Sequence, residues 1–292
     1  MIQGTIIKGI GGFYYVNTKN GVYECRARGI FRKEKTSPVV GDFVWITILD
    51  EEKKKGSLDK IEKRKNELIR PKVANVEQVI IVFAAVSPEI NLDLLDKFLI
   101  SAEEQSLDIV ICINKIDLDK EKKYEKIAEI YKKVGYDVLC ISAAEKIGID
   151  CLKDRLKEKI TVFAGPSGVG KSSLINEIAP HLQLKTGEIS QKIERGKHTT
   201  RHAELIEFSE NSFIVDSPGF TSFYLDYIKK EQLQYYFIEF EPFLQECKFT
   251  GCSHISEPEC GVKNQIGKAI HKSRYDRYVF FYQQLLENER RK

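Results

Sequence analysis

The chain has 292 residues, of which 42% are hydrophobic, and a formal net charge of +3. This length predicts two or three domains. No stretch approaches the roughly 18 apolar residues that a membrane span requires, and the first residues do not resemble a secretory signal. Seven cysteines, an odd number, argue against a disulfide framework. We therefore expect a cytoplasmic protein that binds no membrane.

Charge is distributed unevenly along the chain. Residues 1–70 carry 15 Lys/Arg against 9 Asp/Glu, residues 71–224 carry 20 against 24, and residues 261–292 carry 8 against 3. Two basic ends therefore flank a slightly acidic middle, which suits contact with a polyanion through the ends. A lysine-rich surface that only keeps the protein in solution explains the charge equally well.

Residues 1–66 are predicted to form an all-β domain. "GGFYYVNTKNGVYECRARG" holds two strand-like runs around Asn20-Gly21, which is a hairpin signal, and "VVGDFVWITIL" and "GSLDKIEKR" add further strands. Several short strands in so short a segment favour a small barrel such as an OB-fold. Aromatic and basic residues also alternate here and could stack bases and bind phosphates, although about half of the aromatics are expected in the barrel core: Phe13, Tyr14, Tyr15, Tyr23 and Trp45, with Arg26, Arg28, Arg32 and Lys33.

Residues 67–224 have a different character. "QVIIVFAAV" and "LDIVICIN" are continuous apolar runs, typical of parallel strands buried on both faces. "NLDLLDKFLISAEEQ" has helical spacing, and "KEKKYEKIAEIYKKVG" is an amphipathic helix with Gly135 as its C-cap. Further strands and a helix follow in "DVLCIS", "DCLKDRLKE", "ITVFAG", "AELIEF" and "SFIVD". Strands alternating with helices predict a doubly wound α/β sheet.

Residues 225–292 are predicted to be mostly helical around a cluster of cysteines and a histidine. Cys247, Cys252, His254 and Cys260 form the pattern C-x4-C-x-H-x5-C. Three thiolates and one imidazole predict a closed, tetrahedral and therefore structural Zn²⁺ site. The last helix has an apolar stripe that is expected to face the core rather than a ligand, made of Tyr275, Tyr278, Val279, Tyr282, Leu285 and Leu286.

"GPSGVGKS" matches the phosphate-binding pattern G-x-x-x-x-G-K-[ST], and it follows an apolar strand and precedes a helix, as the pattern requires. In such a loop backbone N–H groups surround the phosphates, and the helix N-terminus favours negative charge. Lys171 is expected to neutralise the β- and γ-phosphates and Ser172 to ligate Mg²⁺. The predicted phosphate-binding residues are Gly165, Pro166, Ser167, Gly168, Val169, Gly170, Lys171, Ser172 and Ser173.

Two later segments are candidate switches. "DSPG" at 216–219 ends an apolar strand, which makes Asp216 a candidate for the Mg²⁺ side and Gly219 a candidate sensor of the γ-phosphate. Alone the pattern is weak, since it is also ordinary turn chemistry. "GKHTTRH" offers Thr199 and Thr200. Either could supply a second hydroxyl to Mg²⁺, and we favour Thr200.

"INKID" at 113–117 is the pattern that reads a guanine base. The carboxylate of Asp117 can accept hydrogen bonds from the N1–H and the exocyclic amine of guanine. Adenine cannot supply that pair, and polar groups left unpaired reject the wrong base strongly. "ISAA" at the end of the next strand is the expected second base loop. The predicted guanine-binding residues are Asn114, Lys115, Ile116, Asp117, Ser142, Ala143 and Ala144.

The order of these motifs is unusual, because the base-reading motifs come before the phosphate loop. An ordinary small GTPase has the phosphate loop first. Moving its last third to the front produces the order seen here, and such a rotation costs little when the original termini lie close together. The sequence therefore predicts a circularly permuted GTPase.

The whole chain resembles the RsgA (YjeQ/YloQ) bacterial GTPases, through "NKID", "GPSGVGKSS", "GKHTTRH", "DSPG" and C-x4-C-x-H-x5-C in this order. The resemblance implies an N-terminal OB-fold, residues 1–66, that binds RNA. It implies a permuted GTPase domain at residues 67–224 and a zinc-binding helical domain at residues 225–292. We expect the protein to be a monomer. The resemblance further implies hydrolysis of GTP to GDP that is stimulated by the small ribosomal subunit. Its 16S rRNA, and not DNA, is then the nucleic-acid partner, in late maturation of that subunit.

Phe220 follows "DSPG" where many GTPases carry a glutamine that orients water. A phenyl ring cannot orient water, so slow intrinsic hydrolysis is expected, with His198 or His202 of "GKHTTRH" as candidates for the missing group. His198 is favoured. One alternative is an RNA-binding assembly factor that uses the nucleotide as a switch with negligible hydrolysis. Another is an ATPase or kinase, which "NKID" disfavours.

Overall fold

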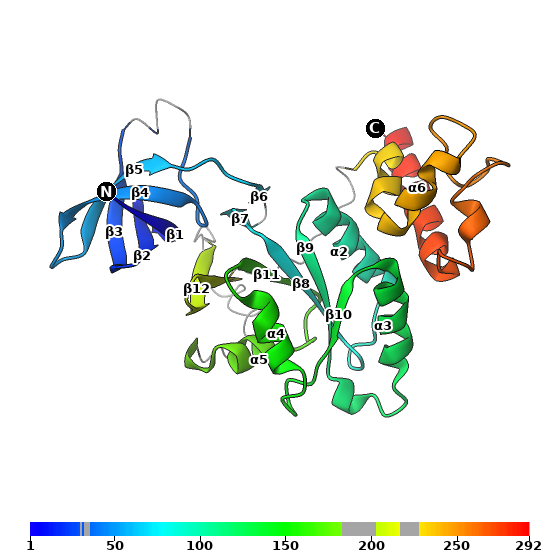
Figure 1. Ribbon diagram of the computed structural model, residues 1–292, viewed down its shortest axis with the longest axis horizontal. Coiled ribbons are helices and arrows are strands. Elements are labelled where there is room, and N and C mark those ends of the chain that lie inside the picture. The colour runs from blue at the N-terminus through cyan, green and yellow to red at the C-terminus, as the bar shows by residue number, and fades with distance from the viewer. Residues whose placement is uncertain (30, 32–35, 70, 183–202, 217–227, 292) are drawn as a thin grey trace.

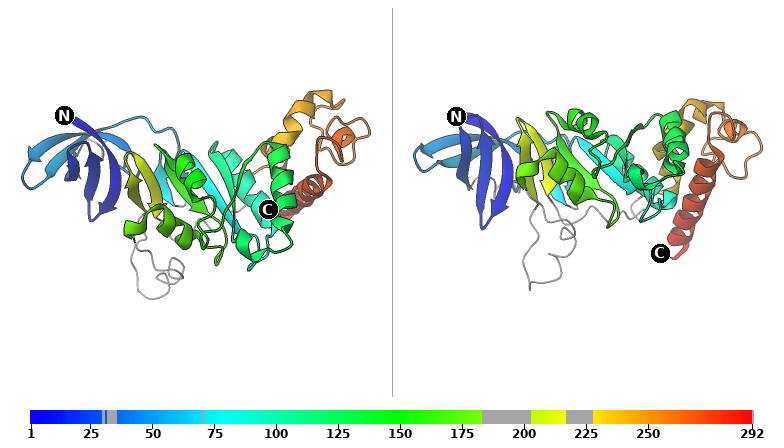
Figure 2. Two further views of the ribbon diagram at one scale, coloured as in Figure 1. Left: turned by 60° about the horizontal axis from the view of Figure 1, so that its bottom comes forward. Right: turned by 90° about the horizontal axis from the view of Figure 1, so that it is seen from below.

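The computed structural model describes residues 1–29, 31, 36–69, 71–182, 203–216 and 228–291. Three parts follow one another along its length: a strand barrel, an α/β sheet domain and a helical module (Figures 1 and 2). None of the helices in these described ranges combines the length and the apolar run needed to span a bilayer.

The N-terminal part is a closed five-stranded barrel. Its strands are β1 (Ile2–Ile10), β2 (Phe13–Thr18), β3 (Gly21–Ala27), β4 (Phe43–Asp50) and β5 (Lys55–Ile61), in the order β1-β2-β3-β5-β4, with β1 pairing back onto β4. The predicted hairpin is present, and the positive φ of +103° falls on Gly21. The predicted OB-type barrel is thus confirmed. Its interior holds Ile6, Val16, Tyr23, Val44, Ile46 and Leu58, all fully buried.

A short hairpin that the sequence analysis did not predict leads from the barrel to the sheet domain. Its strands are β6 (Glu67–Ile69) and β7 (Lys72–Ala74), and the amide of Ala74 donates to the carbonyl of Val40 in the barrel at 2.8 Å. Gly41 lies so close that a Cβ there would meet the carbonyl oxygen of Ala74 at 2.0 Å. The hairpin is therefore packed tightly against the barrel.

The central sheet has six strands in the order β10-β9-β8-β11-β13-β12. They are β8 (Gln78–Ala84), β9 (Asp108–Asn114), β10 (Asp137–Cys140), β11 (Ile160–Ala164), β12 (Glu204–Ser209) and β13 (Ser212–Asp216). Neighbours pair in parallel except at the outer edge, where β12 runs antiparallel to β13. The carboxyl ends of the five parallel strands therefore meet at one edge of the sheet.

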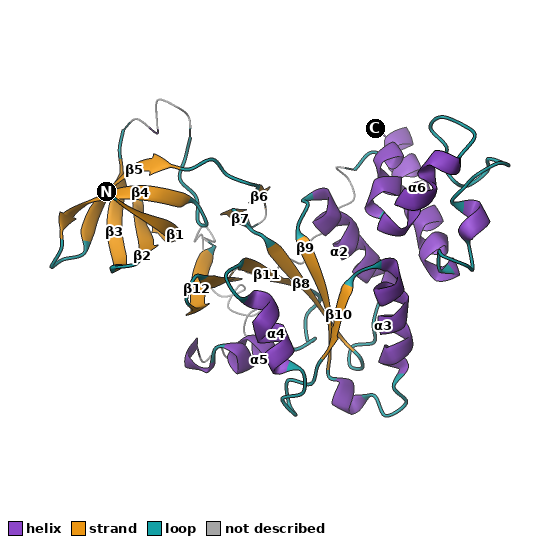
Figure 3. Ribbon diagram, in the orientation of Figure 1, coloured by secondary structure: helices purple, strands orange, loops and turns teal. Residues whose placement is uncertain are grey.

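Helices cover both faces of this sheet (Figure 3). Val79, Ile81 and Phe83 of β8 pack with α2 (Leu92–Glu104) and α3 (Lys123–Val134). The alternate residues Ile80 and Val82 pack with α4 (Ile149–Leu156) and α5 (Lys171–Ile178). Because successive strand side chains point to opposite faces, a strand that is apolar throughout needs both layers. The doubly wound α/β prediction is confirmed, and α3 ends at Gly135 with a left-handed φ of +115° as expected.

The C-terminal module is helical, as predicted. It consists of η4 (Lys230–Tyr236), η5 (Ile238–Glu246), η6 (Lys263–Gln265) and α6 (Lys272–Arg291). The predicted stripe of α6 does face its core, where Tyr278 and Leu285 are buried and the other members pack partly buried or at its margin. Ile100 of α2 also belongs to this core, so the module is packed directly onto the sheet domain.

The seam between the module and the sheet domain contains a buried set of charges that the sequence analysis did not anticipate. Asp96 of α2 accepts hydrogen bonds from the Tyr131 hydroxyl of α3 at 2.6 Å and from Arg277 of α6, and pairs with Arg274 of α6 at 2.6 Å. Glu239 of η5 makes a two-pronged contact with Arg274, at 2.7 and 3.0 Å. We call these five residues the clamp.

Every member of the clamp is buried, and Asp96, Arg274 and Tyr131 are fully so. Burial alone would lower the pKa of Arg274, but Asp96 and Glu239 outweigh it and raise that pKa well above its ordinary value. Burial, with Asp96 beside it, raises the pKa of Tyr131, which stays a neutral donor. Two basic and two acidic side chains thus face each other inside the seam.

Candidate nucleotide site and metal centre

The predicted phosphate loop lies between the end of β11 and the start of α5, at the carboxyl edge of the sheet. Gly165, Gly168 and Gly170 have φ values of +136°, +81° and +93°, which residues with side chains adopt only at a cost. A Cβ at Gly165 would meet the carbonyl oxygen of Val82 at 2.1 Å, and one at Gly170 would meet Nδ2 of Asn114 at 2.4 Å. The loop is thus a glycine-rich turn that leads directly into the N-terminus of a helix, an arrangement that binds phosphate groups.

Lys171 lies at the first position of α5, and its ammonium folds back over the loop. Its Nζ donates to the carbonyl oxygens of Gly165 and Pro166, both at 2.7 Å. Burial lowers the pKa of Lys171 to about 8. The side chain is therefore mostly cationic at neutral pH, in a partly desolvated position where its charge acts strongly on an anion.

Asn114 and Lys115 connect the base-reading loop to the phosphate loop, although more than fifty residues separate them in the chain. The buried Asn114 amide donates to the carbonyl of Val169 at 2.9 Å, and its oxygen accepts from the amide of Ala143 at 3.1 Å. Lys115 donates to the carbonyl of Gly168 at 2.7 Å. One asparagine thus joins both predicted base loops to the phosphate loop.

Asp117 is exposed at the mouth of this site, where its carboxylate is oriented by the second base loop. The buried Ser142 hydroxyl donates to Oδ1 of Asp117 at 2.5 Å and accepts from the amide of Glu145 at 3.1 Å. A carboxylate has about four acceptor positions, so this contact leaves room for two further donors. Ile116 lies between Lys115 and Asp117 in η1 (Ile116–Leu118), and Ala144 is exposed beside Ala143.

Hard oxygen donors of the kind that Mg²⁺ prefers lie at the same edge. Ser172 follows Lys171 at the start of α5, and Asp216 is the last residue of β13, the strand that pairs in parallel with β11. The donor set therefore fits a Mg²⁺ ion accompanying phosphates. The remaining predicted residues lie outside the described part of the chain: His198, Thr199, Thr200, His202, Gly219 and Phe220.

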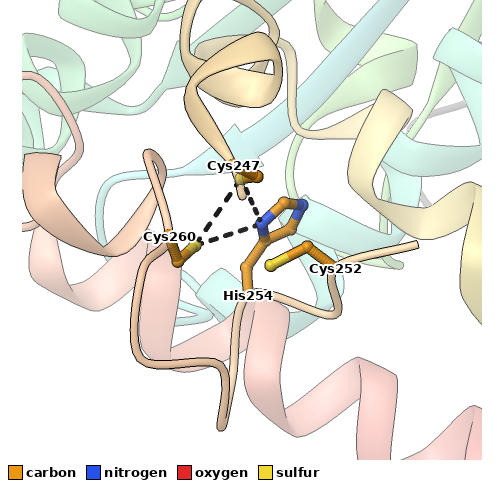
Figure 4. Close-up of side chains that lie close together, drawn as sticks. All are labelled: Cys247, Cys252, His254 and Cys260. Atoms are coloured by element: carbon orange, nitrogen blue, oxygen red, sulfur yellow. Dashed lines mark hydrogen bonds between the residues drawn. The ribbon is translucent and has the colours of Figure 1, made fainter. Parts of the chain in front are cut away.

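The four predicted zinc ligands come together in the module (Figure 4). The ligand atoms of Cys247, Cys252, His254 and Cys260 all lie within 4.8 Å of one another. Nδ1 of His254 is 3.5 Å from Sγ of Cys247 and 3.3 Å from Sγ of Cys260. The fourteen residues from Cys247 to Cys260 are thus folded around one point, which fits a single metal ion.

The surroundings of the cluster also favour a bound cation. Burial raises the pKa values of the Cys252 and Cys260 thiols and lowers that of His254. The imidazole is therefore neutral, while the thiols need a positive ion to become thiolates. Nε2 of His254 lies 2.8 Å from Oε1 of Gln234, which leaves Nδ1 for the metal, as such outer contacts usually do. No spacing rule pointed to Gln234, because it comes from η4.

Comparison with known proteins gives consistent matches over the whole chain. The family model described as RsgA GTPase matches residues 61–226, and the one described as RsgA N-terminal domain matches residues 3–57. A curated protein of Alkaliphilus metalliredigens (strain QYMF), named small ribosomal subunit biogenesis GTPase RsgA, is 52% identical over 99% of this chain and 100% of its own. A protein of the same name from Caldanaerobacter subterraneus subsp. tengcongensis is 47% identical over 100% and 98%.

Solved structures agree. YloQ, described as a circularly permuted GTPase, superposes with a TM-score of 0.83 at 39% identity, covering 98% of this chain and 96% of that one. YjeQ from Thermotoga maritima superposes with a TM-score of 0.85 at 38% identity, covering 98% of each chain. With the permuted order of its loops and the barrel before its sheet, the chain belongs to the RsgA family of circularly permuted GTPases.

Proposed function

We propose that this protein hydrolyses GTP when the small ribosomal subunit stimulates it, and acts in the late maturation of that subunit through contacts with 16S rRNA. The observation that carries the nucleotide part is the bond from Asn114 to the carbonyl of Val169. It joins a guanine-type reader to a phosphate loop. The ribosomal part is supported by the names of the curated relatives and by the basic residues near both ends of the chain.

Contacts support the proposed roles of the described residues, and the sequence motifs support those of Thr200, Gly219 and His198. Asp117, held by Ser142, reads the Watson–Crick edge of guanine, while Asn114 and Lys115 keep the base loop against the phosphate loop. The backbone of residues 165–173 binds the phosphates, and Lys171 balances their charge. Ser172, Asp216 and Thr200 would hold Mg²⁺, which when bound spreads the charge that develops on the phosphates. Gly219 is proposed to sense the γ-phosphate and His198 to orient water.

We propose that the metal at Cys247, Cys252, His254 and Cys260 is Zn²⁺ and that it is structural. Three sulfurs and one nitrogen complete a tetrahedral shell, so no position remains for a reacting water. The proposed division into an RNA-binding barrel (residues 1–66), a GTPase domain (67–224) and a zinc domain (225–292) assigns one task to each part. We further propose a monomer in the cytoplasm that contacts neither DNA nor membranes.

The test is phosphate release from GTP, with and without purified small subunits and with ATP in a parallel reaction. We expect slow release from GTP alone, a large increase with small subunits, and no comparable release from ATP. Subunit binding that depends on GTP but leaves turnover unchanged would instead identify an assembly factor that uses the nucleotide only as a switch.

A His198→Ala variant tests the proposal that His198, which lies outside the described residues, orients the attacking water. If His198 orients water, the variant should lose stimulated turnover by about 10²–10⁴-fold, the usual contribution of such a group, while its affinity for GTP stays the same. His202→Ala is the matched control in the same segment. Unchanged stimulated turnover in His198→Ala would remove His198 from the mechanism.

A further inference from the structure

The barrel touches the sheet domain at β12, the outer strand of the sheet (Figure 1). Nζ of Lys8, in β1, lies 3.0 and 2.8 Å from the two carboxylate oxygens of Glu204, the first residue of β12. Farther along the strand, Nδ2 of Asn17 in β2 donates to Oε2 of Glu207 at 2.7 Å. We call these two contacts the barrel seam.

Glu204 also lies beside a residue that is proposed for the nucleotide site. In the antiparallel ladder of β12 and β13 it lies directly opposite Asp216, and side chains of directly opposed residues lie on the same face of a sheet, with Cβ atoms about 5 Å apart. Asp216 is one of the residues proposed to hold Mg²⁺. The carboxylate that holds the barrel is therefore one cross-strand step from the carboxylate proposed for the metal.

Lys8 is able to exchange its partner. The Lys8 side chain is 34% exposed and that of Glu204 is 40% exposed, and ion pairs in such positions are weak because water screens them. A cavity of about 280 Å³ lies beside the seam and is lined by the chain neighbours of these two residues, Gly9 and Ala203, and by Gly11 and Pro38. A phosphate group can approach the ammonium of Lys8 from solvent because that side chain is partly exposed.

We propose that Lys8 is a cation shared between Glu204 and an RNA phosphate, and that this exchange reports RNA binding to the nucleotide site. When a phosphate takes Lys8, Glu204 is left beside Asp216 without its counter-charge. The added negative charge at that edge then strengthens the hold on Mg²⁺ and its nucleotide. This inference rests on the proposed function, since it takes RNA as the partner of the barrel.

Thermodynamic linkage makes the proposal reciprocal, because any effect of RNA on the metal site requires an equal effect of that site on RNA binding. Two measurable quantities report this coupling and require no turnover assay. One is the Mg²⁺ concentration that half-maximally slows the release of fluorescent GDP. The other is the affinity for a short fluorescein-labelled polyuridylate at fixed salt.

The experiment compares Lys8→Ala and Glu204→Gln with Lys19→Ala, which removes another exposed barrel lysine. In the unchanged protein and in Lys19→Ala, polyuridylate should lower the Mg²⁺ requirement about two- to fivefold, the range of an exposed ion pair. In Lys8→Ala and Glu204→Gln it should leave that requirement unchanged. Glu204→Gln should also bind polyuridylate about two- to fivefold more tightly, because Lys8 is released. An RNA-induced shift that persists in Glu204→Gln would overturn the proposal.

A double variant separates this role from simple RNA binding by Lys8. If Lys8 acts on the metal site only through Glu204, Lys8→Ala combined with Glu204→Gln should have the same Mg²⁺ requirement as Glu204→Gln alone. A further change on adding Lys8→Ala would mean that the two residues do not act as a pair. If small subunits do not stimulate GTP turnover by the wild-type protein, the proposed function is refuted, but this charge coupling can still be measured.

Discussion

The two ends of the molecule are joined to the GTPase domain in opposite ways. The C-terminal module is held by the clamp and by Ile100 inside its core. The charged members of the clamp are all buried: Asp96, Glu239, Arg274 and Arg277. The barrel contacts β12 through two exposed or half-exposed polar pairs, Lys8–Glu204 and Asn17–Glu207. Breaking a buried ion pair is strongly destabilising, while an exposed pair contributes little. The module is therefore fixed on the GTPase domain by buried charges. The polar contacts of the barrel with β12 are exchangeable, although Ile6 of the barrel and Leu205 of β12 belong to one apolar core.

This difference bears on how nucleotide state reaches the rest of the protein. The chain passes from the "DSPG" segment at 216–219 into the module, and that connection lies outside the described residues. The clamp is a second connection, and it runs from the module to α2 and α3, the helix that follows the base-reading loop. A signal that moves the module must therefore carry α2 and α3 with it.

The largest expected effect comes from removing the metal. Structural zinc contributes on the order of 10 kcal/mol in zinc-finger peptides, and here Cys252 and Cys260 belong to the module core. Chelation, or Cys252→Ser, should increase amide hydrogen exchange across residues 228–291 and along α2, with no change in the barrel. Cys151→Ser, at an exposed position of α4, is the control. An equal increase of amide exchange in the barrel would show that the metal stabilises both ends of the molecule alike.

Asp96→Asn should have the next largest effect. It removes the carboxylate between Arg274 and Arg277 and leaves buried positive charge unpaired, at a cost of about 3–5 kcal/mol in the free energy of unfolding. Denaturant unfolding measures it. Asp276→Asn on the same helix as the arginines removes an exposed carboxylate paired with Lys272 and should cost less than about 1 kcal/mol. Similar losses of unfolding free energy in both variants would show that the buried clamp contributes no more than an exposed ion pair.

The smallest effect is expected at the barrel seam. Lys8→Ala combined with Asn17→Ala should change the free energy of unfolding by roughly 0.2–1 kcal/mol for each pair. The barrel should nevertheless lie less firmly against β12, because the polar pairs that supplement their shared apolar core are lost. Small-angle X-ray scattering should then show a more extended molecule than Lys19→Ala does. A loss as large as that of Asp96→Asn would mean that both seams are rigid.

Motifs that depend on neighbours in the chain were predictable from the sequence. The glycines of 165–170 determine a loop because their positive φ angles are local, and the continuous apolar runs of β8 and β9 require two helix layers wherever they lie. The four metal-ligand candidates were also predictable, because Cys247, Cys252, His254 and Cys260 lie within one short segment of the chain and meet at one point.

Contacts between distant segments were not predictable in the same way. The sequence placed Ser142 in a base loop, but it did not show that Ser142 orients Asp117. Nothing in the sequence around Gln234 indicated that it contacts His254. The β6–β7 hairpin was missed because each strand has three residues, too few to show a periodicity.

Residue type and local spacing are enough to predict a phosphate loop, a guanine-binding motif and a metal cluster, in an order typical of a permuted GTPase. How firmly the parts are joined depends instead on contacts between distant segments. Asp96 and Glu204 are both acidic residues in amphipathic elements, and the difference between them is burial. Burial depends on which distant side chains pack around a residue, Arg274 and Arg277 in one case and Lys8 in the other.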